Sequence, residues 1–236
     1  DVLAKYPKIL DDESIRKQLA SFKLIPTQDG KWSTPGNTYK CTEDLKKILG
    51  DAKHLWIDYK RIPNLLDLCS ISNFIDNLGV LKSPICRHLV DRMCYIAEHH
   101  PPTQKAKHES SEAFYILCDN YEKWQEEKEF RDSMAALKSF KCFPAEGDNQ
   151  EWYRADELYA PYRADAFRSQ AKILDFKNTQ KLNNELLKIL GVSINPETKL
   201  VINHLLYCSK NDNNPHVLTY TILNERVQKE ADLIAE

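Results

Sequence analysis

Glycine is scarce in this sequence, with only six among 236 residues. A loop that cradles phosphate needs clustered glycines, because only then can several backbone N–H groups approach the phosphate oxygens. The chain contains no G-x-G-x-x-G motif and no Walker loop. We therefore expect no nucleotide site and no other cofactor site within this chain.

Paired cysteines, long apolar runs and an excess of positive charge are also missing. The seven cysteines are scattered and form no C-x-x-C pair, which favours free thiols in a reducing compartment. No apolar run approaches the length of a membrane span and no leader opens the chain, so we expect no membrane partner and an intracellular location, cytoplasmic or nuclear. The formal net charge of -2 gives no electrostatic reason to expect nucleic acid.

An internal repeat is the main positive signal. The segment Leu19–Pro26 (LASFKLIP) returns 118 residues later as Leu137–Pro144 (LKSFKCFP). Similar matches follow in the same order along the chain, and each pairs a landmark of the first repeat with one of the second. These landmarks are Pro26 with Pro144, Gly30 with Gly147, Trp32 with Trp152, Gly79 with Gly191, and Pro84 with Pro196. Fixed order over five blocks indicates a duplicated unit.

Each repeat predicts a β-hairpin followed by short helices. A turn at Gly30 or Gly147 supplies the positive φ that a tight hairpin requires. Thr42–Gly50 carries an N-cap, early acids, late lysines and a glycine stop, which predicts a helix of about two turns. Ser83-Pro84 and Asn195-Pro196 predict an N-cap followed by proline at the first helical position.

Apolar faces are expected on the helices that surround these landmarks. Further helices are predicted to begin near Ser110 and His216, and Tyr121–Arg131 to form a solvated linking helix. For the helix before Gly79 or Gly191, the predicted apolar face is Ile71, Phe74, Ile75 and Leu78 in the first repeat and Leu182, Leu186, Leu187 and Leu190 in the second. For the proline-opened helix, it is Leu89, Val90, Met93 and Ile96 in the first repeat and Val201, Ile202, Leu205 and Cys208 in the second. The predicted fold is therefore helix-rich α+β, with two tandem winged-helix-like units at residues 1–128 and 129–236.

The pattern I-P-x-x-D-G-x-W, then L-G-V, then a proline-opened helix resembles a repeated module of sacsin-like and no-vein-like proteins. The second repeat departs from it with Cys142–Gly147 (CFPAEG). The resemblance implies a parent protein with an ATPase domain of the kind shared by gyrase, the ninety-kilodalton heat-shock chaperone and histidine kinases. ATP and Mg²⁺ would then bind elsewhere in that parent. The start at Asp1 and the uncapped final helix also suggest a piece of a longer protein.

Candidate reactive residues cluster around position 94. Cys94, His99, His100 and His108, with Cys86 and His88 nearby, are the densest set of potential metal ligands. Zinc sites usually pair ligands two to four residues apart, and the second repeat lacks the equivalents of this set. A solvated loop, including the insertion 101–108, with core thiols is the simpler interpretation, so we expect no metal site.

Catalysis finds equally little support. Ser110, Ser111, Glu112 and Cys118 qualify by residue type, but a helix start explains the first and a core thiol the last. We therefore expect no catalytic residue and no enzyme activity in this chain. Trp32 and Trp152 could stack on a ligand, yet their equivalence after a hairpin turn favours structural packing.

Two functions remain for such a chain. The first is a non-catalytic interaction and spacer region of a larger chaperone-type ATPase protein, which binds a protein partner or client and couples it to the ATPase. The alternative is a tandem winged-helix module that binds nucleic acid in a defence or regulatory protein. Its phosphate contacts would come from Lys5, Lys8, Arg16, Lys17, Arg61 and Arg87.

Overall fold

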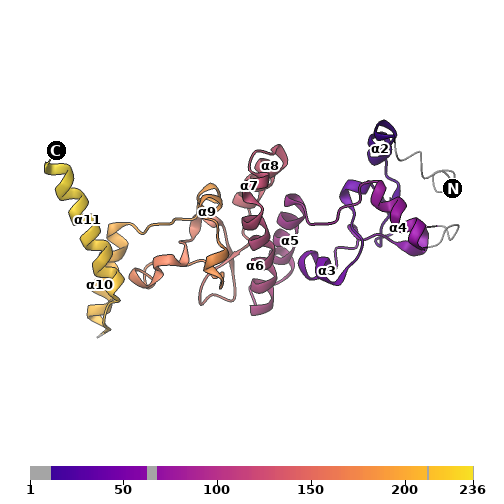
Figure 1. The fold of residues 1–236 in the computed structure, drawn as a ribbon. Coiled ribbons are helices and arrows are strands. Elements are labelled where there is room, and N and C mark those ends of the chain that lie inside the picture. Colours follow the sequence, from indigo (N-terminus) through magenta and orange to yellow (C-terminus); the bar gives the residue numbers. More distant parts are fainter. Residues whose placement is uncertain (1–11, 63–67, 212, 236) are drawn as a thin grey trace. The chain divides into compact units, whose positions relative to one another are not determined.

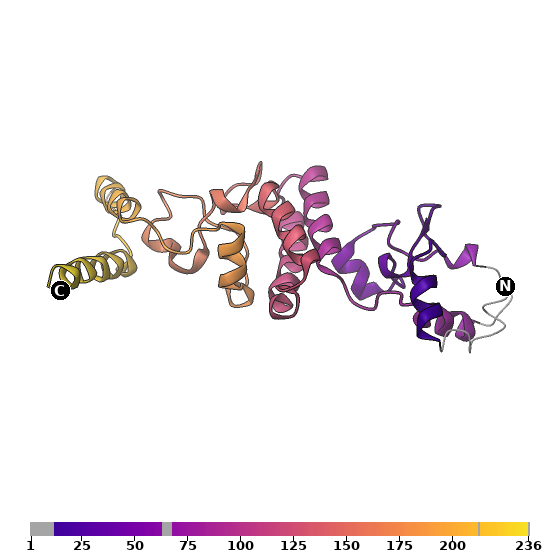
Figure 2. The same ribbon diagram turned by 90° about the horizontal axis from the view of Figure 1, so that it is seen from above.

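A computed structural model of the chain describes residues 12–62, 68–211 and 213–235, without the side chains of 68–71 and 230–235. Lys5 and Lys8, and the side chain of Ile71, lie outside this description. Helices outweigh strands, and two small antiparallel hairpins are present, so the fold is helix-rich α+β as predicted. The chain divides into two compact units, 1–85 and 86–236 (Figures 1 and 2).

The first unit contains one hairpin and three short α-helices among its described residues. Ile25 pairs with Ser33 and Pro26 with Trp32, around a turn in which Gly30 has φ of 86°. The elements are α2 (Glu13–Ala20), β1 (Ile25–Pro26), β2 (Trp32–Ser33), the 3-10 helix η2 (Pro35–Asn37), α3 (Glu43–Leu49), η3 (Tyr59–Arg61) and α4 (Leu68–Asn77). Its core gathers Ile25, Ile57, Ile75, Leu78 and Val80.

The second unit surrounds its hairpin with longer helices. Phe143 pairs with Tyr153 and Pro144 with Trp152. In chain order the elements are α5 (Cys86–His99), α6 (Gln104–Asp119), α7 (Tyr121–Trp124), α8 (Lys128–Ser139), β3 (Phe143–Pro144), β4 (Trp152–Tyr153), η4 (Ala155–Glu157), η5 (Pro161–Ala166), η6 (Thr179–Lys181), α9 (Asn184–Leu190), α10 (Thr198–Lys210) and α11 (Val217–Ala235). Helix α5 packs against both α6 and α8 (Figures 1 and 2).

The two hairpins are held by corresponding backbone hydrogen bonds. Tyr39 forms bridges with Trp56 and Leu81, and the equivalent Tyr159 forms them with Ile173 and Ser193. Bridges from Thr27 to Ile57 and from Ala145 to Leu174 also correspond, as do the bonds from Asp58 N–H to the Pro26 carbonyl and from Asp175 N–H to the Pro144 carbonyl. We call this shared arrangement the hairpin scaffold.

Several predicted elements match the structure. Helix α3 has Thr42 as its N-cap, and Gly50 follows its last residue. Gly79 and Gly191 have positive φ where the preceding helices end. On α5, Leu89, Val90, Met93 and Ile96 are buried as expected.

The prolines at the predicted helix starts are a correction. Helices α5 and α10 begin at Cys86 and Thr198, two residues after Pro84 and Pro196. In the first repeat, the N–H of Ile85 donates to the Tyr39 hydroxyl at 3.2 Å, which holds the chain outside the helix. In the second repeat, the Pro196 carbonyl accepts a bond from Arg226 at 2.8 Å. Both prolines therefore lie in the segment that precedes the helix.

Other helix predictions were also wrong in detail. Helix α6 begins at Gln104, so most of 101–108 is helical and Ser110 lies buried in mid-helix. The segment 121–131 is divided between α7 and α8, with Trp124 and Phe130 buried. Leu182 was expected on the apolar face of α9 but lies before that helix. On α10, Ile202 was expected to be buried but is not, whereas His204 is buried.

The predicted boundary between the repeats also differs from the division in the structure. We placed it at 128/129, whereas the compact units meet at 85/86. The physical reason is that α5 packs on both α6 and α8, and α6 contacts residues around the second hairpin, including Phe143 and Phe176.

Candidate functional site

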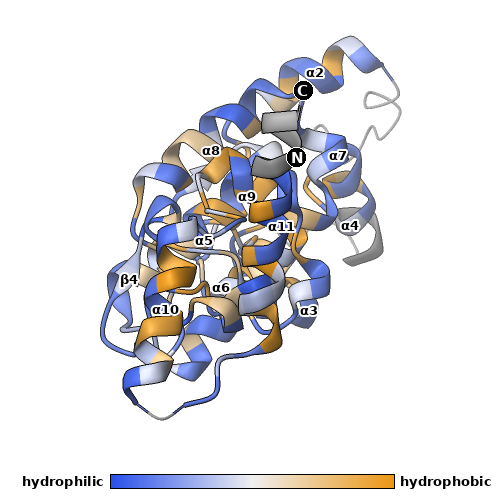
Figure 3. Ribbon diagram, turned by 90° about the vertical axis from the view of Figure 1, so that its left-hand side faces the viewer, coloured by the Kyte–Doolittle hydropathy of each residue, from blue (hydrophilic) through white to orange (hydrophobic). Residues whose placement is uncertain are grey.

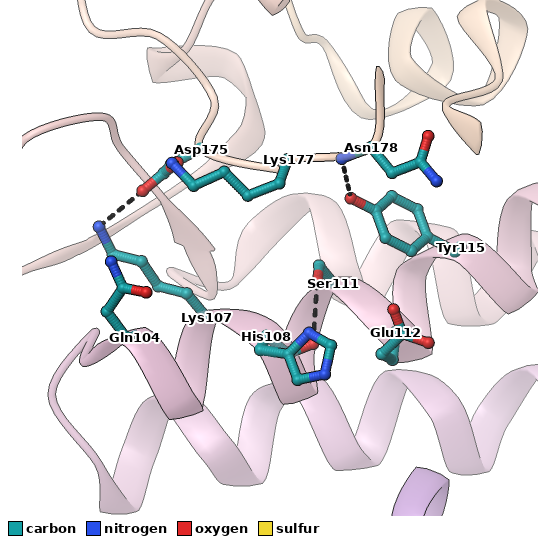
Figure 4. Close-up of a pocket in the computed structure, with 9 residues that line it drawn as sticks. All are labelled: Gln104, Lys107, His108, Ser111, Glu112, Tyr115, Asp175, Lys177 and Asn178. Carbon is teal, nitrogen blue, oxygen red and sulfur yellow. Dashed lines mark hydrogen bonds and ion pairs between the residues drawn. The ribbon is translucent and has the colours of Figure 1, made fainter. Parts of the chain in front are cut away.

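A cavity of about 320 Å³ lies in the second unit between α6 and the segment that follows Leu174 (Figure 4). Helix α6 contributes one wall and the 175–178 segment the other. Its lining is Gln104, Lys107, His108, Ser111, Glu112, Tyr115, Asp175, Lys177 and Asn178.

An ion pair closes one end of this cavity. Lys107 Nζ lies 2.9 Å from Asp175 Oδ2 and donates to the Ala145 carbonyl at 3.2 Å. The side chains of Lys107 and Asp175 are only 10% and 7% exposed. Because burial removes water from both charges, each needs the other to remain ionised at low cost.

Asp175 has a second lysine partner. Lys177 Nζ lies 2.5 Å from Asp175 Oδ1, so both carboxylate oxygens accept from an ammonium group. The hydrogen bond to Asp175 raises the pKa of Lys177. With both oxygens engaged, Asp175 is poorly placed to act as a general base.

Tyr115 and Asn178 join the walls at the other end. The Tyr115 hydroxyl accepts a bond of 2.8 Å from the Asn178 N–H, and burial raises the pKa of Tyr115. The Phe114 ring, on the same helix, lies 5.7 Å from Phe143 and 5.2 Å from Phe176, centroid to centroid. The cavity thus lies along the contact between α6 and the second hairpin scaffold.

The predicted cluster around position 94 is not brought together as a metal site. Cys94 contacts Cys142, while the His99 ring stacks on Tyr95 at 4.1 Å. The His100 carbonyl accepts from Trp152, and His88 lies beside Arg87. No group of three or more His, Cys, Asp or Glu side chains suited to a metal ion occurs in residues 12–62, 72–211 and 213–229.

The two tryptophans have different environments. Trp152 is 7% exposed, packs against Ile96 and Ala106, and donates from Nε1 to the His100 carbonyl at 2.8 Å. Trp32 is 49% exposed, with the Arg61 guanidinium 5.3 Å from its ring centroid. The prediction of structural packing is therefore confirmed for Trp152 and wrong for Trp32.

The candidate nucleophiles are placed differently from one another. Cys118 is a buried thiol whose pKa burial raises to about 12. Ser110 is fully buried on α6, and the Ser111 hydroxyl donates to the His108 carbonyl at 2.8 Å. Glu112 lines the cavity beside Ser111.

Lys107 and its pairing with Asp175 were missed by the sequence reasoning. Asp175 carried a signal, because Asp58-Tyr59-Lys60 corresponds to Asp175-Phe176-Lys177. Lys107 carried none, since a lysine on a helix is normally read as exposed.

Comparisons of the chain with protein families, with curated proteins and with solved structures find no significant match. In the part of the chain that the structure describes, no helix is both long and apolar enough to cross a membrane.

Proposed function

We propose that this chain is a non-catalytic interaction and spacer region, built from two versions of one hairpin-and-helix module. The observation that carries the proposal is that both repeats keep the hairpin scaffold, bridge for bridge, while the potentially reactive side chains differ between them. A backbone arrangement that is repeated without the same reactive side chains suits a structural and binding role.

Binding of a protein partner is supported by the surface. Large apolar side chains are exposed in both units, among them Phe22 at 57%, Leu206 at 55% and Val217 at 73%. Contacts of apolar and aromatic groups are the usual means by which proteins bind one another or hold partly unfolded clients. We infer that these residues contact such a partner.

The nucleic-acid alternative receives less support from the same surface. Lys17 pairs with Glu13 at 2.8 Å, and Arg61 lies over Trp32. Arg87 lies 3.3 Å from a ring nitrogen of His88, and Lys5 and Lys8 lie outside the described residues. The formal net charge of -2 adds no general attraction to phosphates.

The place of the chain in a larger protein follows from the motif that resembles sacsin-like modules. In this proposal the modules are winged-helix-like, the parent is an intracellular protein with a chaperone-type ATPase, and the repeats couple partner binding to that ATPase. The support is the I-P-x-x-D-G-x-W and L-G-V pattern around Gly30 and Gly79.

Binding of a permanently unfolded polypeptide tests the proposal. Fluorescence anisotropy of labelled, reduced and carboxymethylated α-lactalbumin should rise on addition of the purified chain, with a Kd in the micromolar range of about 1 to 100 µM. ATP turnover by the purified chain, or a shift of duplex DNA in place of the unfolded polypeptide, would overturn it.

A further inference from the structure

The second unit contains a contact between helices of the first repeat and the hairpin scaffold of the second. Helices α5 and α6 cover Trp152, which packs on Ile96 and Ala106, and Phe114 of α6 covers Phe176. Trp152 and Phe176 are 7% and 2% exposed as a result. We call this contact the joint.

One face of α5 completes the joint against α8 and the strand that follows it. The Cys86 thiol contacts the Ser133 hydroxyl, and Cys94 contacts Cys142. Val90 stands midway between Cys86 and Cys94 at helical spacing, so it lies on the same face, and it is 3% exposed. Positions 90 and 94 therefore lie on the face of α5 that packs against α8 and the residues that follow it.

The corresponding face of α10 is uncovered. The helices align at an offset of 112 residues, as Leu89 with Val201 shows, so Val90 and Cys94 correspond to Ile202 and Leu206. These two side chains are 44% and 55% exposed, and hydrophobic colour runs along α10 in Figure 3. An uncovered apolar pair thus occupies the place where α5 contacts α8.

Helix α11 repeats the pattern of α6. Their N-caps are Thr103, which accepts from Ala106 N–H, and His216, whose ring Nδ1 accepts from Leu218 N–H. With these aligned, Lys107 and Phe114 correspond to Tyr220 and Val227.

The α11 counterparts are exposed, unlike their α6 equivalents. Tyr220 is 51% and Val227 is 66% exposed, whereas Lys107 and Phe114 are buried in the joint. Ile202, Leu206, Tyr220 and Val227 form what we call the tail face.

In the described residues, the first hairpin scaffold is less covered than the second. Trp32 corresponds to Trp152 and is 49% exposed, and Tyr59 corresponds to Phe176 and is 38% exposed. Helix α2, at the position of α8, has no buried residue. Trp32 and Tyr59 form what we call the head face.

We propose that the tail face of one chain docks on the head face of a second copy of this chain, and so rebuilds the joint between two molecules. Each face is the uncovered half of a contact that the protein already makes once. Tyr220 would bring its hydroxyl to Asp58, as Lys107 brings its ammonium to Asp175. The inference rests on the proposed interaction role and names one partner for it.

Head-to-tail docking predicts a particular kind of assembly. The two surfaces in contact differ, so the interface is heterologous and leaves one head and one tail free after each addition. Chains can therefore grow beyond the dimer. A single substitution on either face should stop growth by that face and leave the other face competent.

Sedimentation velocity of the full 236-residue chain tests the proposal. The mass should rise between about 1 and about 300 µM, a range suited to a modest interface. Leu206→Glu on the tail face and Trp32→Glu on the head face should each remain monomeric. An equimolar mixture of the two should form dimers and nothing larger, because each contributes one intact face.

Tyr207→Glu is the matched control. Tyr207 is 46% exposed beside Leu206, but its equivalent Tyr95 is also 49% exposed, so this position lies outside the joint. The variant should associate like the unmodified chain. Circular dichroism of all three variants should match that of the unmodified protein.

Three results would overturn the proposal: a monomeric unmodified chain throughout the range, a mixture that stays monomeric, or equal loss of association in the Tyr207 variant. If the chain is monomeric yet binds unfolded polypeptide through Leu206, the tail face serves another protein. In that case the proposed interaction role stands and the self-docking does not.

Discussion

Lys107 of α6 and Asp175, 68 residues later, form a buried ion pair with 2.9 Å between Nζ and Oδ2. The pair ties a helix that belongs to the first repeat by sequence to the hairpin scaffold of the second. Asp175 also binds Lys177, but that side chain is 80% exposed, whereas Lys107 is almost enclosed. The stabilising role therefore falls mainly on Lys107.

Replacing Lys107 by methionine should destabilise the second unit. The change leaves the Asp175 carboxylate buried without its enclosed partner, at an expected cost of about 3 kcal/mol in the free energy of unfolding. Urea denaturation followed by circular dichroism measures it. Lys188→Met, which removes the exposed pair with Glu185, should cost less than about 0.5 kcal/mol. Equal effects of the two changes would argue against a special role for Lys107.

The two tryptophans provide a second comparison. Trp152→Ala should cost about 3 to 5 kcal/mol, because it empties a packed site against Ile96 and Ala106. Trp32→Ala should cost less than about 1 kcal/mol at a dilution where the chain is monomeric, because the side chain is half exposed. Thermal unfolding of both variants decides the point. A larger loss for Trp32 would show that its packing has been misread.

His204 should make stability depend on pH. Its Nδ1 lies 2.7 Å from the Ser169 hydroxyl, and burial lowers the pKa of His204 below 6.5, while nearby Asp165 acts in the opposite direction. Below pH 6.5 the unfolded chain therefore binds a proton that the folded chain resists. The stabilisation is present above that pH and is lost as the pH falls from 6.5 towards the folded pKa.

His204→Gln isolates this contribution. Unfolding free energies measured between pH 5 and pH 7.5 should fall less steeply with acid in the variant than in the unmodified chain. An unchanged slope would mean that other groups account for the pH dependence.

The thiols should differ sharply in reactivity. Burial raises the pKa of Cys86 and of Cys118 to about 12, whereas Cys41 is exposed. At pH 8 only about one in ten thousand of the buried thiols would be thiolate, the reactive form. Maleimide labelling followed by peptide mass spectrometry should therefore find Cys41 modified first, and Cys86 and Cys118 only in denaturant. Comparable labelling rates in the folded chain would contradict their burial.

The hairpins and helix stops were predictable because their signals are local. Gly30 and Gly147 have positive φ in turns that few other residues adopt, and Thr42 and Gly50 mark the two ends of α3. Such features depend on a residue and its immediate neighbours. The Tyr39 and Tyr159 bridges then follow from the same spacing in both repeats.

The remaining features depend on contacts between distant residues. The start of α6 was placed too late because its first turns bury Lys107, whose charge hides the helical period of apolar residues. Pro84 resembles a first helical residue until the bond from Ile85 to Tyr39, 46 residues away, is known. Ile202 has the hydrophobicity of a core residue, yet its side chain is 44% exposed.

The joint has a consequence for how this chain can be divided. In the sequence, each repeat starts with a hairpin and ends with a pair of helices. The compact second unit instead starts with the helix pair α5–α6 and continues into the next hairpin. The repeat read from the sequence and the compact second unit therefore have different boundaries. A fragment that starts at residue 129 would begin with the second repeat but would lack α5 and α6, so Trp152 and Phe176 would be exposed. A fragment that starts at residue 86 would keep both side chains covered.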